Sequence, residues 1–120
     1  MKVFNLLGHK NQFITYHADA VYFQSYDTLM ATLTQSFEGS YGETLEMNSH
    51  YWSVTTGKHM KAFLDETHML DTVLDLIHKY KLFRNLKDFM ERANIVKVLN
   101  GIITVDYTNE KGETVVYNCL

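Results

Sequence analysis

The spacing of apolar residues changes twice along this chain of 120 residues. Before the middle of the chain, apolar and polar residues tend to alternate, which is the period of a β-strand with one buried face. From Met60 to Ala93 the apolar residues recur at i, i+3 and i+4, the spacing of amphipathic helices, and after Ile95 alternation returns. Because strands and helices occupy separate parts of the sequence, we predict a single α+β domain over residues 1–120.

An antiparallel N-terminal meander is predicted before the helices. Its longest strand is Val21–Leu33, where the alternation continues through a bend near Tyr26 and Asp27. A helix that begins with Asp27 as its N-cap is the alternative, but the threonines of this segment lower helix propensity. The remaining strands and the loop of this half are expected at a short run Lys2–Leu7, at Gln12–His17, at a loop Gln35–Glu43, at Thr44–Met47 and at Tyr51–Val54.

Three short helices are predicted next, with few residues between them. Their apolar stripes run through Met60, Phe63 and Leu64, through Met69–Ile77, and through Leu82–Ala93. Side chains that accept hydrogen bonds from free backbone N–H groups stand at the expected starts. They are Thr55 or Thr56 for the first helix, Asp65 or Thr67 for the second, and Asn85, in a capping box with Asp88, for the third.

A C-terminal three-stranded meander ends the predicted fold. Asn100-Gly101 separates Ile95–Leu99 from Ile102–Tyr107. This dipeptide favours a type I′ hairpin turn, because both of its residues readily adopt positive φ. A second turn at Asn109–Gly112 leads to the last strand, Glu113–Cys119.

Composition narrows the classes of function. Hydrophobic residues make up 46% of the chain, which is enough for a core, and a net charge of −3 argues against a polyanion-binding surface over the whole domain. The single cysteine, Cys119, excludes an intrachain disulfide and fits a reducing cytosol. No run approaches the roughly 20 apolar residues of a membrane span. We therefore expect a cytoplasmic protein without membrane contact.

The segment Thr55–His59 is the one that most resembles a chemical motif. A P-loop requires a glycine five residues before its Gly-Lys pair and a hydroxyl residue after the lysine. Trp52 and His59 occupy those two positions here. We interpret the segment as a strand-to-helix junction, with anion binding by backbone N–H groups and Lys58 as the alternative.

The other polar residues predict no catalytic or metal centre. The six histidines include no pair at i, i+4, and the chain has no Cys-x-x-Cys. Ser53 lacks the glycines of a nucleophile elbow. We therefore expect a protein that is not an enzyme and has no catalytic residues, no metal and no cofactor.

One local cluster of cations has aromatic residues between its members. We name it the basic patch; it consists of Lys79, Lys81, Arg84 and Lys87. Cations interleaved with Tyr80 and Phe83 are typical of nucleic-acid contacts. The alternative is that lysines near a helix C-terminus simply complement the helix dipole.

Aromatic side chains with polar tips are abundant, with eight tyrosines and one tryptophan. Tyr and Trp are favoured at protein–protein contacts, because they bury a large area at little cost in rotamer freedom. The residues expected to contact a partner protein are Tyr26, Glu38, Tyr41, Glu43, Trp52, Lys58 and His59.

Two segments resemble a family of small, uncharacterised phage proteins. Ser25–Ala31 has its Ser-Tyr-x-Thr-x-x-Ala strand pattern, and Ser53–His59 has its Ser-x-Thr-Thr-x-Lys-His strand-to-helix motif. The resemblance covers Val21–Leu64 and implies a phage origin, but no activity comes with it. Phage accessory proteins of this size include proteins that disable host machinery, anti-CRISPR inhibitors among them.

These observations lead to one expected function and one alternative. The chain is expected to be a non-enzymatic, phage-type protein-binding module in the host cytoplasm. Its partner would be a host protein such as a CRISPR-associated nuclease, which it would inhibit by occluding a surface. The alternative is a nucleic-acid-binding accessory protein that uses the basic patch.

Overall fold

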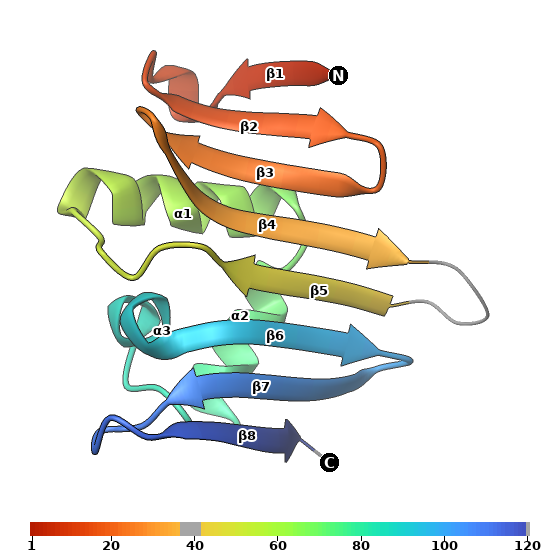
Figure 1. Ribbon diagram of the computed structural model, residues 1–120, viewed down its shortest axis with the longest axis vertical. Helices are drawn as coiled ribbons and strands as arrows, with labels where there is room; N and C mark the ends of the chain where they lie inside the picture. Colours follow the sequence, from red (N-terminus) through yellow and green to blue (C-terminus); the bar gives the residue numbers. More distant parts are fainter. Residues whose placement is uncertain (37–41, 120) are drawn as a thin grey trace.

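The computed structural model describes residues 1–36 and 42–119 (Figure 1). Within these residues, eight strands form one antiparallel sheet whose spatial order is the order in sequence. The strands are β1 (Lys2–Asn5), β2 (Gln12–His17), β3 (Ala20–Ser25), β4 (Thr28–Ser36), β5 (Gly42–Met47), β6 (Ala93–Leu99), β7 (Ile102–Thr108) and β8 (Thr114–Cys119). The helices are a short 3-10 helix η1 (Leu6–Gly8) and α1 (Val54–Glu66), α2 (Leu70–His78) and α3 (Leu86–Arg92).

The predicted class is confirmed: an N-terminal antiparallel meander and a C-terminal three-stranded meander flank three α-helices. The two meanders are one sheet, because β5 pairs with β6 from Gly42 opposite Leu99 to Glu46 opposite Ile95. Leu45 and Val96 face each other in this pairing, and both are fully buried. The helical segment is therefore a long connection between two neighbouring strands.

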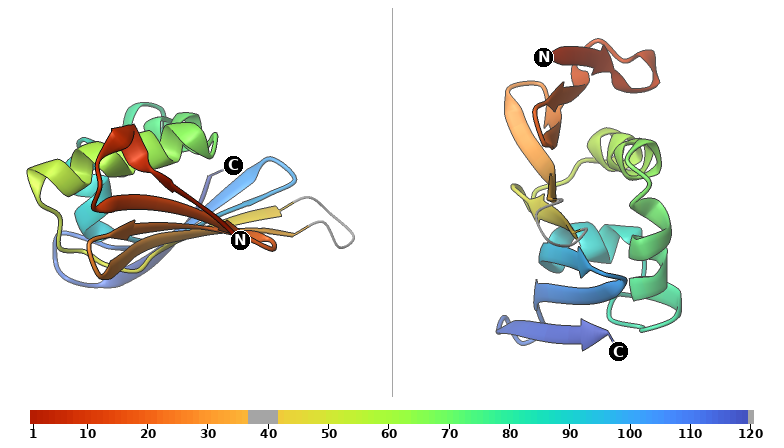
Figure 2. Two further views of the ribbon diagram at one scale, coloured as in Figure 1. Left: turned by 90° about the horizontal axis from the view of Figure 1, so that it is seen from above. Right: turned by 90° about the vertical axis from the view of Figure 1, so that its right-hand side faces the viewer.

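All three α-helices cover the same face of the sheet (Figure 2). Phe23 of β3 stacks on Phe63 of α1, with ring centroids 5.6 Å apart, and both are fully buried. Cross-strand neighbours on this face form a buried row from β2 to β7: Ile14, Phe23, Ala31, Leu33, Leu45, Val96 and Val105. The alternate residues of these strands point to the opposite side, which we name the open face.

The prediction of one strand over Val21–Leu33 is wrong. The chain reverses at Tyr26 and Asp27, so β3 and β4 pair with each other and Ser25 lies opposite Thr28. Tyr26 adopts a φ of 53°, which permits the tight reversal. Both halves of the predicted strand do form strands, so the alternating period was read correctly, but the turn between them was missed. The Gln12–His17 strand is confirmed.

The predicted start of the first helix is also wrong. Residues 51–53 are not a strand, and α1 begins at Val54 with Ser53 as its N-cap instead of Thr55 or Thr56. The Ser53 hydroxyl accepts a hydrogen bond from the Thr56 backbone N–H at 3.1 Å. A cap needs extended backbone before the helix, and Ser53 has it, with φ −79° and ψ 166°.

The cap predicted for α2 is wrong, and the cap predicted for α3 is confirmed. Neither Asp65 nor Thr67 caps α2, because α1 continues to Glu66 and α2 begins after Met69 without a side-chain cap. Asn85 does cap α3, since its side chain accepts from the Asp88 N–H at 2.9 Å. The predicted capping box differs in its second bond, because the Asp88 carboxylate accepts from the Arg84 N–H at 2.9 Å.

The predicted turn at Asn100-Gly101 is confirmed as a hairpin turn. Asn100 has φ 50° and Gly101 has φ 83°, the positive values that a type I′ turn requires. The turn brings Leu99 opposite Ile102 and fixes the register of β6 with β7.

Candidate functional site

The residues predicted to contact a partner lie in different environments. Tyr26 is 56% exposed in the turn between β3 and β4, and Lys58 is exposed on α1. Glu43 is half-buried on β5, where burial raises the pKa of its carboxyl group, while nearby His68 acts in the opposite direction. Glu38 and Tyr41 lie outside the described residues.

Trp52 and His59 belong more to the interior than to the surface. The half-buried indole of Trp52 packs on Phe23 and donates its N–H to the Ser49 carbonyl at 3.1 Å. His59 is 4% exposed, with its Nδ1 atom 2.7 Å from the Thr55 carbonyl and its ring 5.1 Å from that of His9. Trp52 thus packs the segment before α1 on β3, and His59 packs α1 on the connection between η1 and β2.

A chain of hydroxyl groups joins the start of α1 to the sheet. Gln12 donates its side-chain N–H to the Ser25 hydroxyl at 2.9 Å, and Ser25 lies 3.2 Å from the Thr56 hydroxyl. Ser53 completes the chain with a 2.9 Å hydrogen bond to the same Thr56 hydroxyl. The threonine-rich segment predicted as a strand-to-helix junction therefore works as an anchor for the helix. The hollow beside it, of about 340 Å³, is lined by Ser25, Tyr26, Thr28, Met30, Ser49, Tyr51, Ser53 and Thr56.

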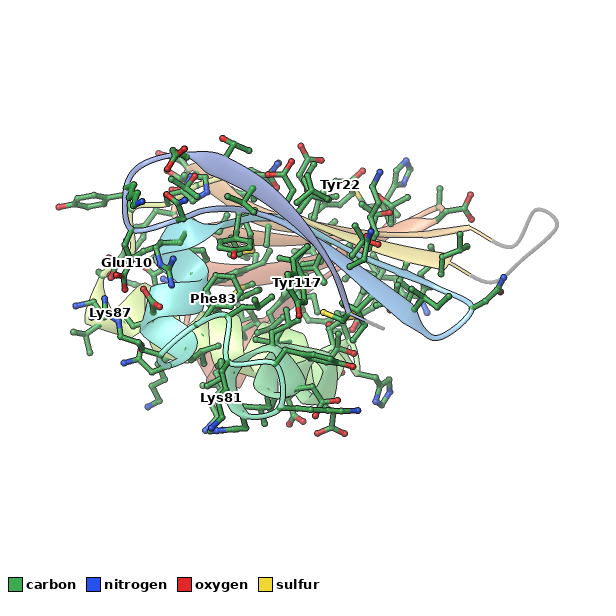
Figure 3. The ribbon with its side chains drawn as sticks, turned by 90° about the horizontal axis from the view of Figure 1, so that it is seen from below. Tyr22, Lys81, Phe83, Lys87, Glu110 and Tyr117 are labelled. Atoms are coloured by element: carbon green, nitrogen blue, oxygen red, sulfur yellow. The ribbon has the colours of Figure 1, made fainter. Side chains whose placement is uncertain are left out.

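A larger concavity lies on the open face, over the first four strands. We name it the apolar basin; it has a volume of about 660 Å³ and is lined by Met1, Val3, Phe13, Thr15, His17, Tyr22, Gln24 and Leu29. The register explains how these residues meet: Thr15 lies opposite both Val3 and Tyr22, and Gln24 lies opposite Leu29. In Figure 3, Tyr22 extends from the side of the sheet that faces away from the helices.

The lining of the apolar basin combines apolar side chains with polar side chains. Met1, Val3 and Leu29 are 85%, 52% and 41% exposed, so apolar surface is open to solvent. The polar groups among the lining residues are hydroxyls, one amide and the imidazole of His17. The backbone of Tyr26 adjoins the basin, since the Gln24 side chain donates to the Tyr26 carbonyl at 2.7 Å, and Tyr26 itself lines the hollow at the start of α1.

The basic patch surrounds the connection between α2 and α3, and acidic residues are interspersed with it. Arg84 contacts the Asp88 carboxylate at 3.6 Å, and Lys87 lies 3.9 Å from Glu91. Lys81 and Arg84 line a hollow of about 480 Å³ together with Glu110. Figure 3 shows Lys81 and Lys87 on the helix side of the molecule. Lys79, the remaining member, lies over the Tyr80 ring at 5.2 Å.

Sequence reasoning missed the ion pair between Arg92 and Asp88. The Arg92 guanidinium donates to both carboxylate oxygens, at 2.8 Å and 2.6 Å, and also reaches the carbonyls of Leu82 at 3.2 Å and Thr108 at 3.3 Å. The guanidinium also lies 5.3 Å from the Phe83 ring. Arg92 thus connects α3, the preceding loop and β7. Its i, i+4 spacing from Asp88 was the available signal.

We predict that the Asp88 carboxyl group makes the stability of the fold depend on pH in acid. Hydrogen bonds from Arg92 lower its pKa from 3.8 to about 2, although burial acts in the opposite direction. A lowered folded-state pKa means that the ionised form stabilises the fold above about pH 4, and that this is lost as pH falls through about 2. The contribution is about 2 kcal/mol. The free energy of unfolding of the wild type should therefore decrease between about pH 5 and pH 2 by about 2 kcal/mol more than that of Asp88→Asn. Denaturant titrations at the two pH values measure this difference. Equal losses in both proteins would contradict this assignment.

Three further features concern metal binding, the cysteine thiol and membrane crossing. Within residues 1–36 and 42–119, no three His, Cys, Asp or Glu side chains gather as a metal site would require. Burial raises the pKa of the Cys119 thiol, which keeps it in the protonated, weakly nucleophilic form. No described helix combines the length and the apolar character needed to cross a lipid bilayer.

Comparison with known proteins places the first part of the chain in a family. A search of curated proteins and a search of solved structures each found no match. A family model matches residues 1–75, more than half of the 120 residues, and so includes the apolar basin but neither the basic patch nor β8. The chain belongs to the family of unknown function DUF8033.

Proposed function

We propose that this chain is a non-enzymatic protein-binding module that contacts its partner through the apolar basin and Tyr26. The observation that carries the proposal is the exposure of apolar side chains in a concave region of a sheet face that no described helix covers. Contiguous exposed apolar surface costs free energy in water, and it commonly marks a surface that a partner covers. The apolar basin is such a surface, because adjacent strands place its lining residues side by side.

The residues that line the apolar basin indicate which kind of partner segment would bind there. Its lining includes no Asp or Glu, so a cationic side chain inserted there would lose water without gaining an opposite charge. Thr15, Tyr22 and Gln24 offer hydroxyl and amide groups among its lining residues. A protein segment that inserts an aliphatic or aromatic side chain and forms neutral hydrogen bonds around it fits this arrangement.

A host protein is the partner class that the phage resemblance supports. The proposed mode of action is occlusion of a surface on that partner, which requires no reacting group. We propose a CRISPR-associated nuclease as the first partner to test. Binding at the apolar basin would then block the nuclease surface that the basin covers.

Leu29→Asp tests this surface directly. The substitution places a charge in the apolar basin at a residue that is already 41% exposed, so the fold is retained. If Leu29 is a hot spot worth about 2 kcal/mol, the affinity for a host CRISPR-associated nuclease falls by about 30-fold, and inhibition of target cleavage falls with it. Titration calorimetry and a cleavage assay measure the two effects.

Ile102→Asp is the matched control. Ile102 is also an exposed apolar residue, 50% accessible at the start of β7, and it is not among the residues that line the apolar basin. It should leave affinity unchanged. Tight binding by Leu29→Asp, or equal loss in both variants, would reject the apolar basin as the interface. If the wild type neither binds nor inhibits the nuclease, that partner is rejected.

Nucleic-acid binding by the basic patch is the weaker alternative. Lys81 and Arg84 line a hollow, which favours it, but Asp88, Glu91 and Glu110 lie among the cations and reduce the local positive potential. Binding of single-stranded DNA or RNA that weakens steeply with salt, and that is abolished by charge reversal within the basic patch, would favour this alternative over the apolar basin.

A further inference from the structure

The two edges of the sheet are protected to different degrees. The edge strand β1 is four residues long, carries Lys2 and is followed by the 3-10 helix, all features that discourage pairing with another strand. The opposite edge strand, β8, is six residues long and has the sequence TVVYNC, with no charge and no proline. In an edge strand of this kind, a row of backbone N–H and C=O groups is available to another strand.

The side chains of β8 are also open to a partner. Within the described residues β8 pairs with β7 alone, and it lies at the end of the sheet farthest from β1 (Figure 1). Val116 on the open face is 62% exposed, and Tyr117 on the helix-covered face is 41% exposed. A strand added at this edge would cover apolar surface on both faces.

We infer that β8 pairs antiparallel with β8 of a second copy of this chain. A two-fold axis through Val116 places this residue opposite its own counterpart. Val115 then faces Tyr117, and Thr114 faces Asn118, by counting equal steps from the axis. Apolar residues meet apolar residues, polar residues meet polar residues, and no charges are opposed.

The same symmetry favours a second copy over an unrelated strand. A two-fold contact uses one surface twice, so it requires a strand whose sequence complements itself, and Thr114–Asn118 satisfies that condition. An axis perpendicular to the sheet also keeps both helical layers on one side. The apolar basin lies over β1–β4, away from this edge, so each copy retains its own basin. Dimer formation is therefore independent of the proposed function.

Variants with one added cysteine test both the pairing and its register. In V116C the two new thiols lie directly opposite each other, and mild oxidation should yield a disulfide-linked dimer. N118C is the matched control on the same strand and face. Position 118 faces Thr114 of the second copy, so the two thiols added by N118C lie about 13 Å apart along the strands and should cross-link several-fold less. Equal cross-linking in both variants, or none in V116C, would overturn the register.

The solution mass of the unmodified protein supplies a measurement that needs no substitution. Sedimentation velocity should show a concentration-dependent dimer, and V116K should be monomeric because two lysines would face each other at the axis. I102K, an exposed residue on the neighbouring strand, should still form the dimer. A wild-type chain that stays monomeric up to millimolar concentration would overturn the inference, as would a dimer that V116K leaves intact.

Discussion

Arg92→Met is expected to lower the free energy of unfolding by about 3–5 kcal/mol, the usual cost of removing one partner from a buried ion pair. The Asp88 side chain is 8% exposed and the Arg92 side chain 17%, so the carboxylate would remain in the interior without its main donor. The carbonyls of Leu82 and Thr108 would lose their hydrogen bonds from the guanidinium as well. Methionine keeps apolar contact with Phe83, which restricts the change mainly to the polar interactions. Denaturant titration near neutral pH measures the difference.

Arg84→Met is the control for this prediction. Arg84 contacts the same carboxylate at 3.6 Å, but its side chain is 76% exposed. An exposed ion pair of this kind contributes about 1 kcal/mol or less. If Arg84→Met and Arg92→Met destabilised the protein equally, the distinction between a buried connector and a surface contact would be wrong.

Phe63→Ala is expected to have an effect of similar size, about 3–5 kcal/mol, through loss of packing. Phe63 is fully buried on α1 and stacks on Phe23 of the sheet. Its removal deletes a large apolar side chain and leaves a cavity between two layers that relax only partly. Because α1 is held to β3 by this pair, the hydrogen exchange of the α1 amides should accelerate along with the loss of stability.

Val54→Ala is the corresponding control on the same helix. Val54 is the first residue of α1 and is 93% exposed, so its truncation should change stability by about 0.5 kcal/mol or less. A small effect of Phe63→Ala, comparable to this control, would show that the contact between α1 and the sheet is not the main support of the helical layer.

The features that the sequence predicted best depend on neighbouring residues alone. The turn at Asn100-Gly101 follows from the ability of two adjacent residues to adopt positive φ. The Asn85 cap likewise depends on one side chain and an N–H group three residues later. Where several local solutions were available, the prediction failed. Ser53, Thr55 and Thr56 are all competent caps by residue type, but only Ser53 stands before the helix with extended backbone, while Thr55 and Thr56 lie within α1.

The candidate interface was only partly predictable for a related reason. Tyr26 was predicted to contact a partner from its residue type, whereas Phe13, Tyr22 and Leu29 were not, although they lie on adjacent strands. Their proximity depends on cross-strand register. Because the turn after Ser25 was not recognised, the prediction placed Leu29 on the same strand as Tyr22. In the structure Leu29 lies on the neighbouring strand, β4.

The sequence by itself determined the period of each segment, and with it the α+β class and two antiparallel meanders around three helices. Only the tertiary structure decided that the meanders form one sheet, because the pairing of β5 with β6 joins residues separated by the whole helical segment. Side-chain period specifies which face of a strand is buried but not which distant strand lies beside it. All three helices cover one face, so the other face stays open. The apolar basin lies on that open face over β1–β4, and β8 forms one edge of the sheet.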